Sequence, residues 1–530
     1  MLALTRADSA RSQGRVLSGR DAVWSDTALR RLTNAGLLGL LQGFVANAAG
    51  HYWLIPALVH AGDYDALQSS SMWFVLCAFQ GLRSALISVL VAAAATTVTL
   101  RVAAFPLALV LGEWIGWMLL PWYTASWLVA CPEFVQLAEL GGPLLVSGII
   151  GAINAALAMA VLSLRAATDG RARVRAAARW MGAAVASVAV LWTHGHLRVR
   201  AVEVELARSD RLRVAVVHAD SGRTSKHNPI QDLRSDTLDA IREQAVDLVI
   251  WPETAIDFPV DVAKLESFAR DQILRDRRRS ITSERLETPL VTGMVVRESI
   301  PPDIARATHA GSNFAPSTAL YNSAVLFDAS GKVQGRYDKR QLLAVGEVAP
   351  WSGVLEGIFP AAGHFSAGRR SPALTFSGVR AAVSICYEDL LPEAFRRSVL
   401  ESRPRLLVNL TSDSWFRGTP GAALHGALAQ LRAVEHRRAL IRATRDGATA
   451  IIAPTGKVLQ ELAAGDSALV GEAPLVTTRT PFTRYGNAWL WVPALGLMGC
   501  AGFSRRRADF RLALHRRFKI GAPSSPRRAR

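Results

Sequence analysis

The apolar residues of this chain follow two different patterns. Six long stretches are almost continuously apolar, five of them in the first 200 residues and one near the C-terminus. A helix needs about 20 apolar residues to cross the hydrocarbon core of a bilayer, so runs of this kind are typical of membrane spans. The predicted spans are residues 35–59, 72–95, 102–123, 142–162, 177–193 and 487–503.

Between the fifth and sixth predicted spans, the pattern changes to short apolar runs separated by polar stretches. The predicted strands are residues 213–218, 246–251, 290–296, 324–328, 381–385 and 405–410, and the clearest predicted helices are 236–244 and 426–442. Strands that alternate with helices favour an α/β fold. This polar region is therefore expected to form an α/β sandwich inserted between membrane-spanning α-helices.

The charged residues indicate the direction in which the chain crosses the membrane. There are 61 Lys and Arg against 43 Asp and Glu, a formal net charge of +18. Arginines cluster beside apolar stretches, at residues 6–31, 101, 165–179 and 505–530, and no nucleic-acid-binding module surrounds them. Because loops rich in Lys and Arg stay in the cytoplasm, the excess indicates cytoplasmic loops and no binding to nucleic acid.

The spans and the charges together predict five parts of the chain. Acidic loops around Asp63 and Glu139 fall on the side opposite the arginine clusters. Five crossings then place the region after residue 199 outside, which in a bacterium is the periplasmic face of the inner membrane. The expected parts are a basic cytoplasmic N-terminus (1–33), a transmembrane domain (34–199), a periplasmic domain (200–486), a C-terminal membrane helix (487–503) and a basic cytoplasmic tail (504–530).

Three segments place a reactive side chain directly after an apolar strand, which is where active sites of α/β folds usually lie. They are residues 248–256, 335–347 and 381–392. In the first, a Trp-Pro pair ends the strand and leaves Glu253 at its tip. In the third, Cys386 follows the strand as a nucleophile on a strand-to-helix turn would.

These segments supply the groups that thiol chemistry requires. A thiol attacks a carbonyl carbon only as the thiolate, so it needs a base, and the oxyanion that forms needs a donor or a positive charge. Glu253, Lys339 and Cys386 supply one of each. A Cys-His pair is less favoured, since the nearest candidates by sequence, His364 and His425, do not follow a comparable strand. A single cysteine after a strand is more often a packing residue, so the prediction depends on all three together.

The order Glu-Lys-Cys resembles the carbon-nitrogen hydrolase (nitrilase) superfamily, and its combination with membrane spans is similar to the apolipoprotein N-acyltransferases. Further motifs that carry this resemblance are YNS at 321–323, GE at 346–347, CYE at 386–388, NLTSDSWF at 409–416, His425, RAVE at 432–435 and RAT at 442–444, with Glu113, Pro121, Trp122 and Asn154 in the membrane part. Two short stretches depart from the family pattern, namely KHN at 226–228 and LLAVGE at 342–347.

The resemblance implies a nitrilase-like αββα sandwich and a role for each member of the triad. Glu253 would be the general base, Lys339 would stabilise the oxyanion, and Cys386 would be the nucleophile that becomes an acyl thioester. No cofactor and no metal is implied, and the four cysteines show no CxxC spacing. The supporting site residues would be Glu347, Tyr387 and Glu388.

The resemblance also implies the substrates. The acyl donor would be a membrane phospholipid, and the acceptor would be the α-amine of the diacylglyceryl-cysteine that begins a bacterial apolipoprotein. Two other interpretations remain open from the residues alone. One is a membrane-anchored amidase that hydrolyses a small amide, and the other is a catalytically silent scaffold of the same fold.

Two pairs of charged residues invite structural hypotheses. Arg83 and Glu113 lie inside predicted spans at similar depth, where unpaired charge is costly, so we expect them to pair. The alternative is that the span boundaries are misplaced and Arg83 extends to the interface. Arg432 and Glu435, three residues apart on a predicted helix, are expected to form a structural ion pair.

Overall fold

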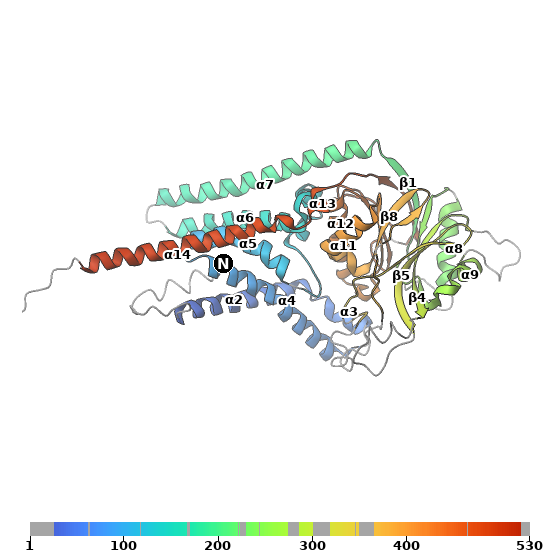
Figure 1. Cartoon of the computed structure of the whole chain (residues 1–530), viewed down its shortest axis with the longest axis horizontal. Helices are drawn as coiled ribbons and strands as arrows, with labels where there is room; N and C mark the ends of the chain where they lie inside the picture. Colours follow the sequence, from blue (N-terminus) through green and yellow to red (C-terminus); the bar gives the residue numbers. More distant parts are fainter. Residues whose placement is uncertain are drawn as a thin grey trace, which may run out of the picture.

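The structure is a computed structural model. It describes residues 26–61, 64–116, 118–166, 170–220, 222, 229–242, 244–273, 286–299, 318–344, 346–348, 365–370, 372–463 and 465–520. A bundle of long helices occupies one side of the molecule, and two β-sheets with their covering helices occupy the other (Figure 1).

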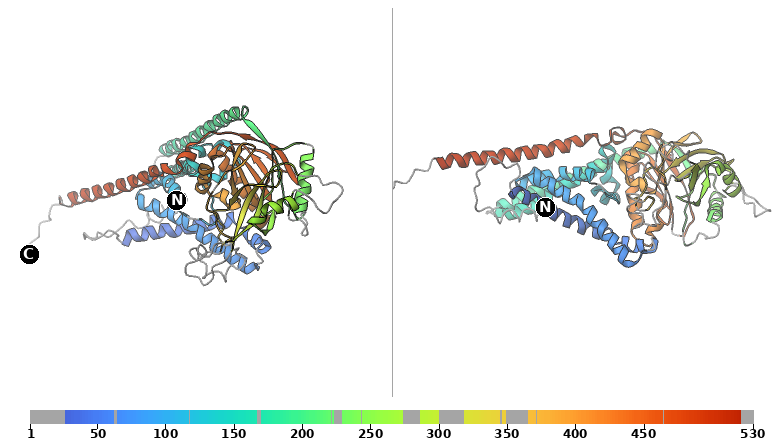
Figure 2. Two further views of the ribbon diagram at one scale, coloured as in Figure 1. Left: turned by 45° about the vertical axis from the view of Figure 1, so that its right-hand side comes forward. Right: turned by 60° about the horizontal axis from the view of Figure 1, so that its bottom comes forward.

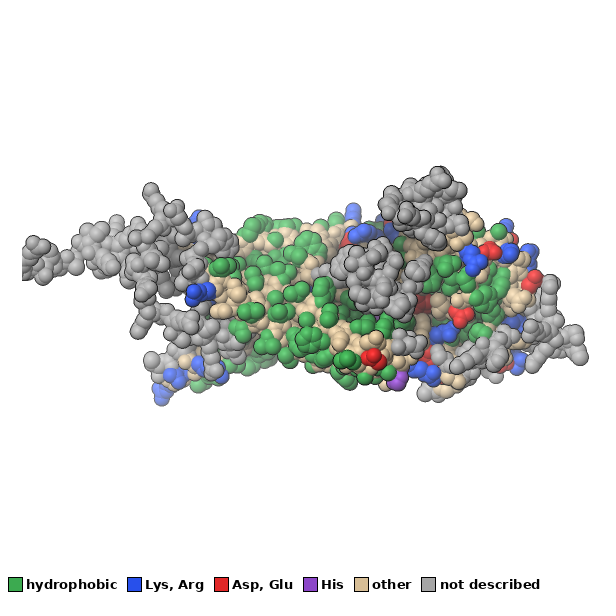
Figure 3. All heavy atoms as spheres, turned by 90° about the horizontal axis from the view of Figure 1, so that it is seen from below, with side chains coloured by type: hydrophobic (Ala, Val, Ile, Leu, Met, Phe, Trp, Pro, Cys, Tyr) green, Lys and Arg blue, Asp and Glu red, His purple; other side chains and the backbone are tan. Residues whose placement is uncertain are grey.

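The helix bundle carries the apolar surface that the sequence predicts. Its members are α2 (Asp26–Gly50), α4 (Ala66–Ala94), α5 (Val98–Ile115), α6 (Ala138–Ala166), α7 (Gly170–Leu206) and α14 (Trp491–Ile520). Four stretches, Ala66–Ala94, Val98–Ile115, Ala138–Arg165 and Gly170–Leu206, are long and apolar enough to cross a membrane. On the face shown in Figure 3, hydrophobic side chains form a broad band along the bundle, and charged side chains lie beyond both of its ends, basic ones at the end away from the sheets and both acidic and basic ones toward the sheet domain. The C-terminal helix α14 runs beyond the other helices, away from the sheets (Figure 2).

In two of the apolar stretches, the helix ends earlier than the hydrophobic pattern predicts. The stretch 35–59 is divided, since α2 ends at Gly50 and a short helix, α3 (Leu54–Ala61), follows. The stretch 102–123 ends as a helix at Ile115, where Gly116 leaves the helical conformation. In both places some of the later apolar residues are buried against protein, namely Trp53, Ala57 and Met118. The ring centroids of Trp53 and of Phe416 in the sheet domain, for example, lie 5.3 Å apart. Apolarity alone does not distinguish such contacts from contacts with lipid.

The expected ion pair between Arg83 and Glu113 is wrong. Arg83 donates to the carbonyl of Trp122 at 2.8 Å and lies over its indole ring, 4.5 Å from the ring centroid. Glu113 accepts from the backbone N–H and the hydroxyl of Thr124, at 2.9 and 2.6 Å. Among the described residues no direct ion pair joins the two side chains, although Glu113 is close enough for its charge to act on Arg83. Both of them instead hold the connection between α5 and α6.

This arrangement predicts a small effect for Glu113→Gln. Removing one partner of a buried ion pair typically costs about 3–5 kcal/mol, because the other charge is left uncompensated. Gln keeps an acceptor for Thr124, so we expect the free energy of unfolding to change by about 1 kcal/mol or less. Thermal unfolding in detergent micelles measures this change, and a loss in the ion-pair range would restore the pairing hypothesis.

The sheet domain is built from two mixed sheets. The first has the order β13-β1-β2-β4-β5-β6, with β3 also paired to β4, and the second has the order β12-β11-β10-β9-β8-β7. Strands of the first sheet are β1 (Asp210–Val217), β2 (Leu248–Ile250), β3 (Ile256–Asp261), β4 (Leu290–Ser299), β5 (Thr318–Phe327), β6 (Val333–Asp338) and β13 (Ala468–Leu475). Those of the second are β7 (Leu374–Phe376), β8 (Val379–Ile385), β9 (Leu406–Ser412), β10 (Ala439–Arg445), β11 (Ala450–Ile452) and β12 (Val458–Glu461).

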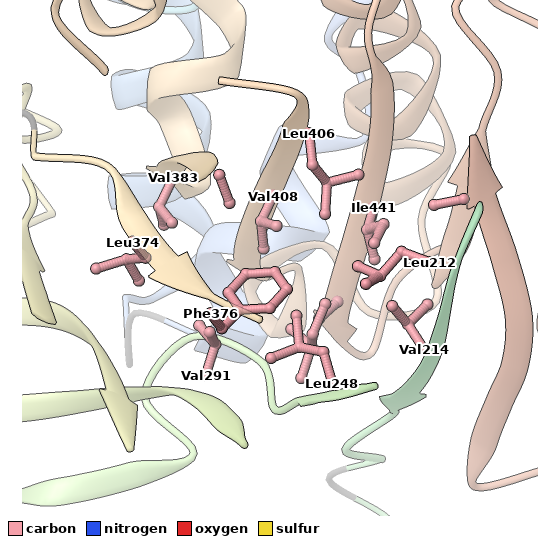
Figure 4. Close-up of a cluster of buried hydrophobic side chains, with 14 of the residues drawn as sticks. Leu212, Val214, Leu248, Val291, Leu374, Phe376, Val383, Leu406, Val408 and Ile441 are labelled. Carbon is pink, nitrogen blue, oxygen red and sulfur yellow. The ribbon is translucent and has the colours of Figure 1, made fainter. Parts of the chain in front are cut away.

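The apolar runs of the central strands are explained by burial on both faces. In β1, Leu212, Val214 and Val216 point into the core between the two sheets, as Figure 4 shows for the first two. Ala215 and Val217 point to the other face, into the layer beneath the covering helices. Because successive side chains of a strand alternate between faces, a strand covered on both sides must be apolar throughout.

Helices cover the outer face of each sheet and complete the expected αββα sandwich. On the first sheet they are α8 (Pro229–Arg242) and α9 (Leu265–Phe268), and on the second they are α11 (Pro392–Ser402) and α12 (Gly421–His436). The α11 and α12 layer faces the membrane helices (Figure 1). Leu431 and Val434 of α12 pack with Ala138 and Val146 of α6, so the sandwich is seated directly on the bundle.

A buried carboxylate joins the two parts. Glu139 of α6 accepts two hydrogen bonds from Arg198 of α7, at 2.6 and 2.8 Å, and one from Arg437 at 2.7 Å. Arg437 also donates to Gln136 and to the carbonyl of Pro454, both at 2.8 Å. Two membrane helices and the end of α12 therefore meet at Glu139.

The predicted helix over 426–442 is correct in place and wrong at its end. Helix α12 ends at His436, and Arg437 takes a left-handed conformation with φ +49°. Strand β10 begins two residues later. Glycine usually provides this conformation, so an arginine here gives no local signal, and its contacts with Glu139 and Pro454 hold it in place. The expected pair of Arg432 and Glu435 is present, at 2.5 Å.

Candidate active site

The three predicted catalytic side chains follow three strands whose ends meet. Glu253 comes after β2, Lys339 comes after β6, and Cys386 comes directly after β8. Glu253 and Lys339 are 5% and 1% exposed. The Lys339 Nζ lies 3.5 Å from Oε1 of Glu253. Cys386 is close enough to both for their charges to act on its pKa.

Lys339 is held by a second carboxylate. Its Nζ lies 2.9 and 2.8 Å from the two carboxylate oxygens of Glu347. Burial alone would lower the pKa of Lys339, but Glu253, Cys386 and Glu347 raise it, so the amine stays protonated. Glu347 is itself fixed by the backbone N–H of Leu343, at 2.9 Å. The site therefore contains a permanent positive charge.

Glu253 is fixed by two further donors. The Nδ2 of Asn322, on β5, donates to its Oε1 at 2.8 Å and to Glu347 at 3.0 Å. The backbone N–H of Ser412, at the end of β9, donates to Oε2 at 2.7 Å. Burial raises the pKa of Glu253, Glu347 raises it further, and Lys339 and the two donors oppose the change. The net effect is a raised pKa, which makes the Glu253 carboxylate a stronger base than an exposed glutamate.

The close approach of β4 to Glu253 requires a glycine. Gly293 donates to the carbonyl of Pro252 at 3.2 Å, and a Cβ at this position would lie 2.6 Å from the Cα of Glu253. Thr254, the next residue, has φ +46°. The tight turn at Thr254 and the absence of a side chain at Gly293 of β4 thus allow Glu253 to lie at the edge of the sheet.

Cys386 sits on a strained turn. It begins the 3₁₀ turn η5 (Cys386–Leu390) with φ +51°, a conformation that non-glycine residues adopt at a cost and only where contacts hold them. Burial raises the pKa of the Cys386 thiol, Glu253 raises it further, and Lys339 lowers it. The thiol is therefore protonated at neutral pH and needs a base to become a nucleophile.

Glu388 holds this turn against the lysine loop. Its carboxylate accepts from the backbone N–H groups of Ile385, Arg340 and Gln341, at 2.8, 2.8 and 3.0 Å. The hydroxyl of Tyr337 adds a bond of 2.7 Å. Glu388 thus joins the turn of the cysteine to the residues that follow Lys339.

The remaining predicted residues have separate positions. Tyr387 is half-buried beside the cysteine, and burial raises its pKa to about 12, so the phenol stays protonated. Both ring nitrogens of His425 are occupied by carboxylates, so it is not a base for Cys386. His364, His227 and Val345 lie outside the described residues.

Sequence reasoning did not assign two contributors to the site. Asn322 appeared only within a motif, and the N–H of Ser412 has no side-chain signal. Both are recognisable only when the middle of β5 and the end of β9 are known to lie beside Glu253. In the part of the chain that the structure describes, no group of three or more His, Cys, Asp and Glu residues could hold a metal ion.

Comparison with known proteins identifies the family. Residues 213–479 match the carbon-nitrogen hydrolase family, and residues 23–156 match the N-terminal domain of apolipoprotein N-acyltransferases. The chain is 30% identical over 407 residues to the apolipoprotein N-acyltransferase of Azotobacter vinelandii, which covers 74% of this chain and 71% of the relative. It is 28% identical over 465 residues to the apolipoprotein N-acyltransferase of Chromobacterium violaceum, and the match covers 85% of this chain and 82% of the relative.

A solved structure with a similar fold is an amidase from Nesterenkonia sp., with 20% identity, a TM-score of 0.36, and coverage of 54% of this chain and 96% of that one. The two family matches account for both the membrane helices and the αββα sandwich. The chain therefore belongs to the carbon-nitrogen hydrolase superfamily and, within it, to the apolipoprotein N-acyltransferase family.

Proposed function

We propose that this protein transfers an acyl chain from a membrane phospholipid, through a thioester on Cys386, to the α-amine of the diacylglyceryl-cysteine of a bacterial apolipoprotein. The observation that carries the proposal is the meeting of Glu253, Lys339 and the strained turn of Cys386 in a domain seated on membrane helices. The family supports the reaction, and the apolar helices support substrates that remain in a bilayer.

In the first step, Glu253 accepts the proton of the Cys386 thiol, and the sulfur attacks the ester carbonyl of the phospholipid. The developing oxyanion is stabilised by the charge of Lys339. When the tetrahedral intermediate collapses, the ester C–O bond breaks, and the leaving lysophospholipid oxygen takes the proton back from Glu253. A thioester remains on Cys386.

In the second step, the amine of the apolipoprotein attacks the thioester carbonyl and gives a proton to Glu253. The C–S bond breaks, the amide forms, and the sulfur recovers the proton. An amide is more stable than a thioester, so the transfer runs toward the product. Glu347 would keep Lys339 charged and in place, and Glu388 would keep the cysteine turn in place.

A site attached to the bilayer suits both substrates. Moving an acyl chain into water costs about 0.8 kcal/mol for each exposed CH₂ group, so donor and acceptor both stay in the membrane. The arginine clusters in the sequence support cytoplasmic loops, which would place the sandwich on the periplasmic face of the inner membrane.

Intact-protein mass spectrometry tests the proposal. The full chain in detergent, incubated with phospholipid, is expected to gain the mass of one acyl chain, to lose it in hydroxylamine, and to carry it on the peptide that contains Cys386. Addition of a diacylglyceryl-cysteine peptide should discharge the adduct into an N-acyl peptide. The exposed cysteine provides a control, since Cys131→Ser should keep the adduct.

The other outcomes separate the two alternatives. Hydrolysis of small amides without an acyl adduct would replace the proposal with an anchored amidase. If the protein forms no adduct and hydrolyses no amide, the result would favour a catalytically silent scaffold.

A further inference from the structure

A buried histidine lies between the two segments that form the active site. His425, on α12, is 5% exposed. Its Nδ1 is 2.7 Å from Oδ1 of Asp413, and its Nε2 is 2.9 Å from Oδ1 of Asp389. The second oxygen of Asp413 accepts from Arg442 of β10 at 3.1 Å. None of these side chains takes part in the two chemical steps above.

Both aspartates are adjacent to catalytic groups. Asp389 belongs to η5, the 3₁₀ turn that begins with Cys386. Asp413 directly follows Ser412, whose backbone N–H donates to Glu253. A bridge through His425 therefore connects the turn of the nucleophile to the strand end that fixes the base.

The geometry determines the charge of the imidazole. An ionised carboxylate only accepts hydrogen bonds, so a ring with a carboxylate at each nitrogen must donate from both and carry a positive charge. Two positive groups, His425 and Arg442, then balance two buried carboxylates. Burial alone would lower the pKa of His425, but Asp389 and Asp413 raise it to about 9.

We propose that His425 is a positioning residue, which as an imidazolium bridges Asp389 and Asp413 and so fixes the turn of Cys386 relative to the strand end that binds Glu253. This inference rests on the proposed function and adds a residue to its machinery. The turn needs such a restraint because Cys386 is held at φ +51°. Displacing reacting groups by ~1 Å can reduce a rate by ~10²-fold.

The pH dependence of the bridge follows from the raised pKa. His425 titrates near 6.5 when unfolded and near 9 in the folded chain, so its contribution is fully present below pH 6.5 and is lost as the pH rises through about 9. The charged groups facing the ring are Asp389 from η5, Asp413 after β9 and Arg442 from β10. We expect acyl loading of Cys386 to fall along the same alkaline limb.

The test uses His425→Asn and His425→Gln, each of which keeps one donor without the charge. Acyl loading from phospholipid is timed by mass spectrometry from pH 6 to 10, with thermal unfolding as the measure of folding. We expect folded variants to load ~10²-fold more slowly and to lack the alkaline limb near pH 9. The exposed His60→Gln is the control and should match the wild type.

Several results would overturn the inference. Folded variants that load at the wild-type rate, or that are slower but keep the alkaline limb, would leave His425 a packing residue. If neither variant folds, Asp389→Asn decides, because removing one carboxylate should move the alkaline limb to lower pH, and an unmoved limb contradicts the bridge. Absence of any adduct in the wild type would instead count against the proposed function. In that case nitrogen-15 NMR of labelled histidines tests the charge of His425 independently.

Discussion

Glu253→Gln is expected to slow acyl loading of Cys386 by ~10²–10⁴-fold, the usual contribution of a general base. Gln has the same size but cannot take the thiol proton. One of the hydrogen bonds from Asn322 and Ser412 also becomes unfavourable, because these two donors bind different carboxylate oxygens and the amide of Gln has only one oxygen. The rate should therefore be measured in a single turnover by quenched mass spectrometry and normalised to the folded fraction. Cys386→Ala, which has no thiol to acylate, gives the background.

The same variant distinguishes a base from a nearby charge. The Glu253 carboxylate raises the pKa of Cys386, so removing it should lower that pKa and speed alkylation of the thiol by iodoacetamide. Faster alkylation together with slower acyl loading identifies Glu253 as the base. If both rates rise, Glu253 acts only through its charge and another group takes the proton. The exposed Glu401→Gln should change neither rate.

Glu139→Ala is expected to destabilise the protein by about 3–5 kcal/mol, the usual cost of breaking a buried ion pair. The substitution leaves Arg198 and the buried Arg437 without their carboxylate at the junction of the two parts. Thermal and denaturant unfolding in the same detergent measure the loss. We also expect the sandwich and the bundle of the variant to stop unfolding in one common transition.

An exposed ion pair across the same junction serves as the matched control. Glu203 of α7 binds Lys457 of the sandwich at 2.6 Å, but both side chains are more than 40% exposed. Exposed pairs contribute about 0–1 kcal/mol, so Glu203→Ala should be nearly silent. Equal losses for the two variants would show that burial of Glu139 is not what makes its contacts important.

The sequence was sufficient for features that depend on composition over several residues. Four of the six long apolar runs correspond to helices that are long and apolar enough to cross a membrane, and apolar runs such as that of β1 located strands buried on both faces. Glu253 and Cys386 could be located because each follows such a strand, whereas Lys339 follows the polar edge strand β6 and was located through the order Glu-Lys-Cys. These signals are local, since each is produced by neighbours in the chain.

The features that escaped prediction depend on distant contacts. The end of α12 at Arg437 is held by Glu139, which is 298 residues away in sequence. Asn322 and the N–H of Ser412 contribute to the site only because the middle of β5 and the end of β9 lie beside Glu253. The direct partner of Arg83 is Trp122 and not Glu113, because equal depth in two spans does not determine which groups meet.

The junction at Glu139 also bears on the order in which the protein is assembled. Arg198 follows Glu139 by 59 residues, whereas Arg437 follows it by 298. During synthesis Arg198 is therefore available to Glu139 well before Arg437, which is added only after most of the chain has been made. The bond between Arg437 and Glu139 can form only when the end of α12 has reached its place in the folded sandwich. A nascent chain that fails at that stage keeps a half-paired acid and an uncovered Gln136 amide, which distinguish it from the finished enzyme.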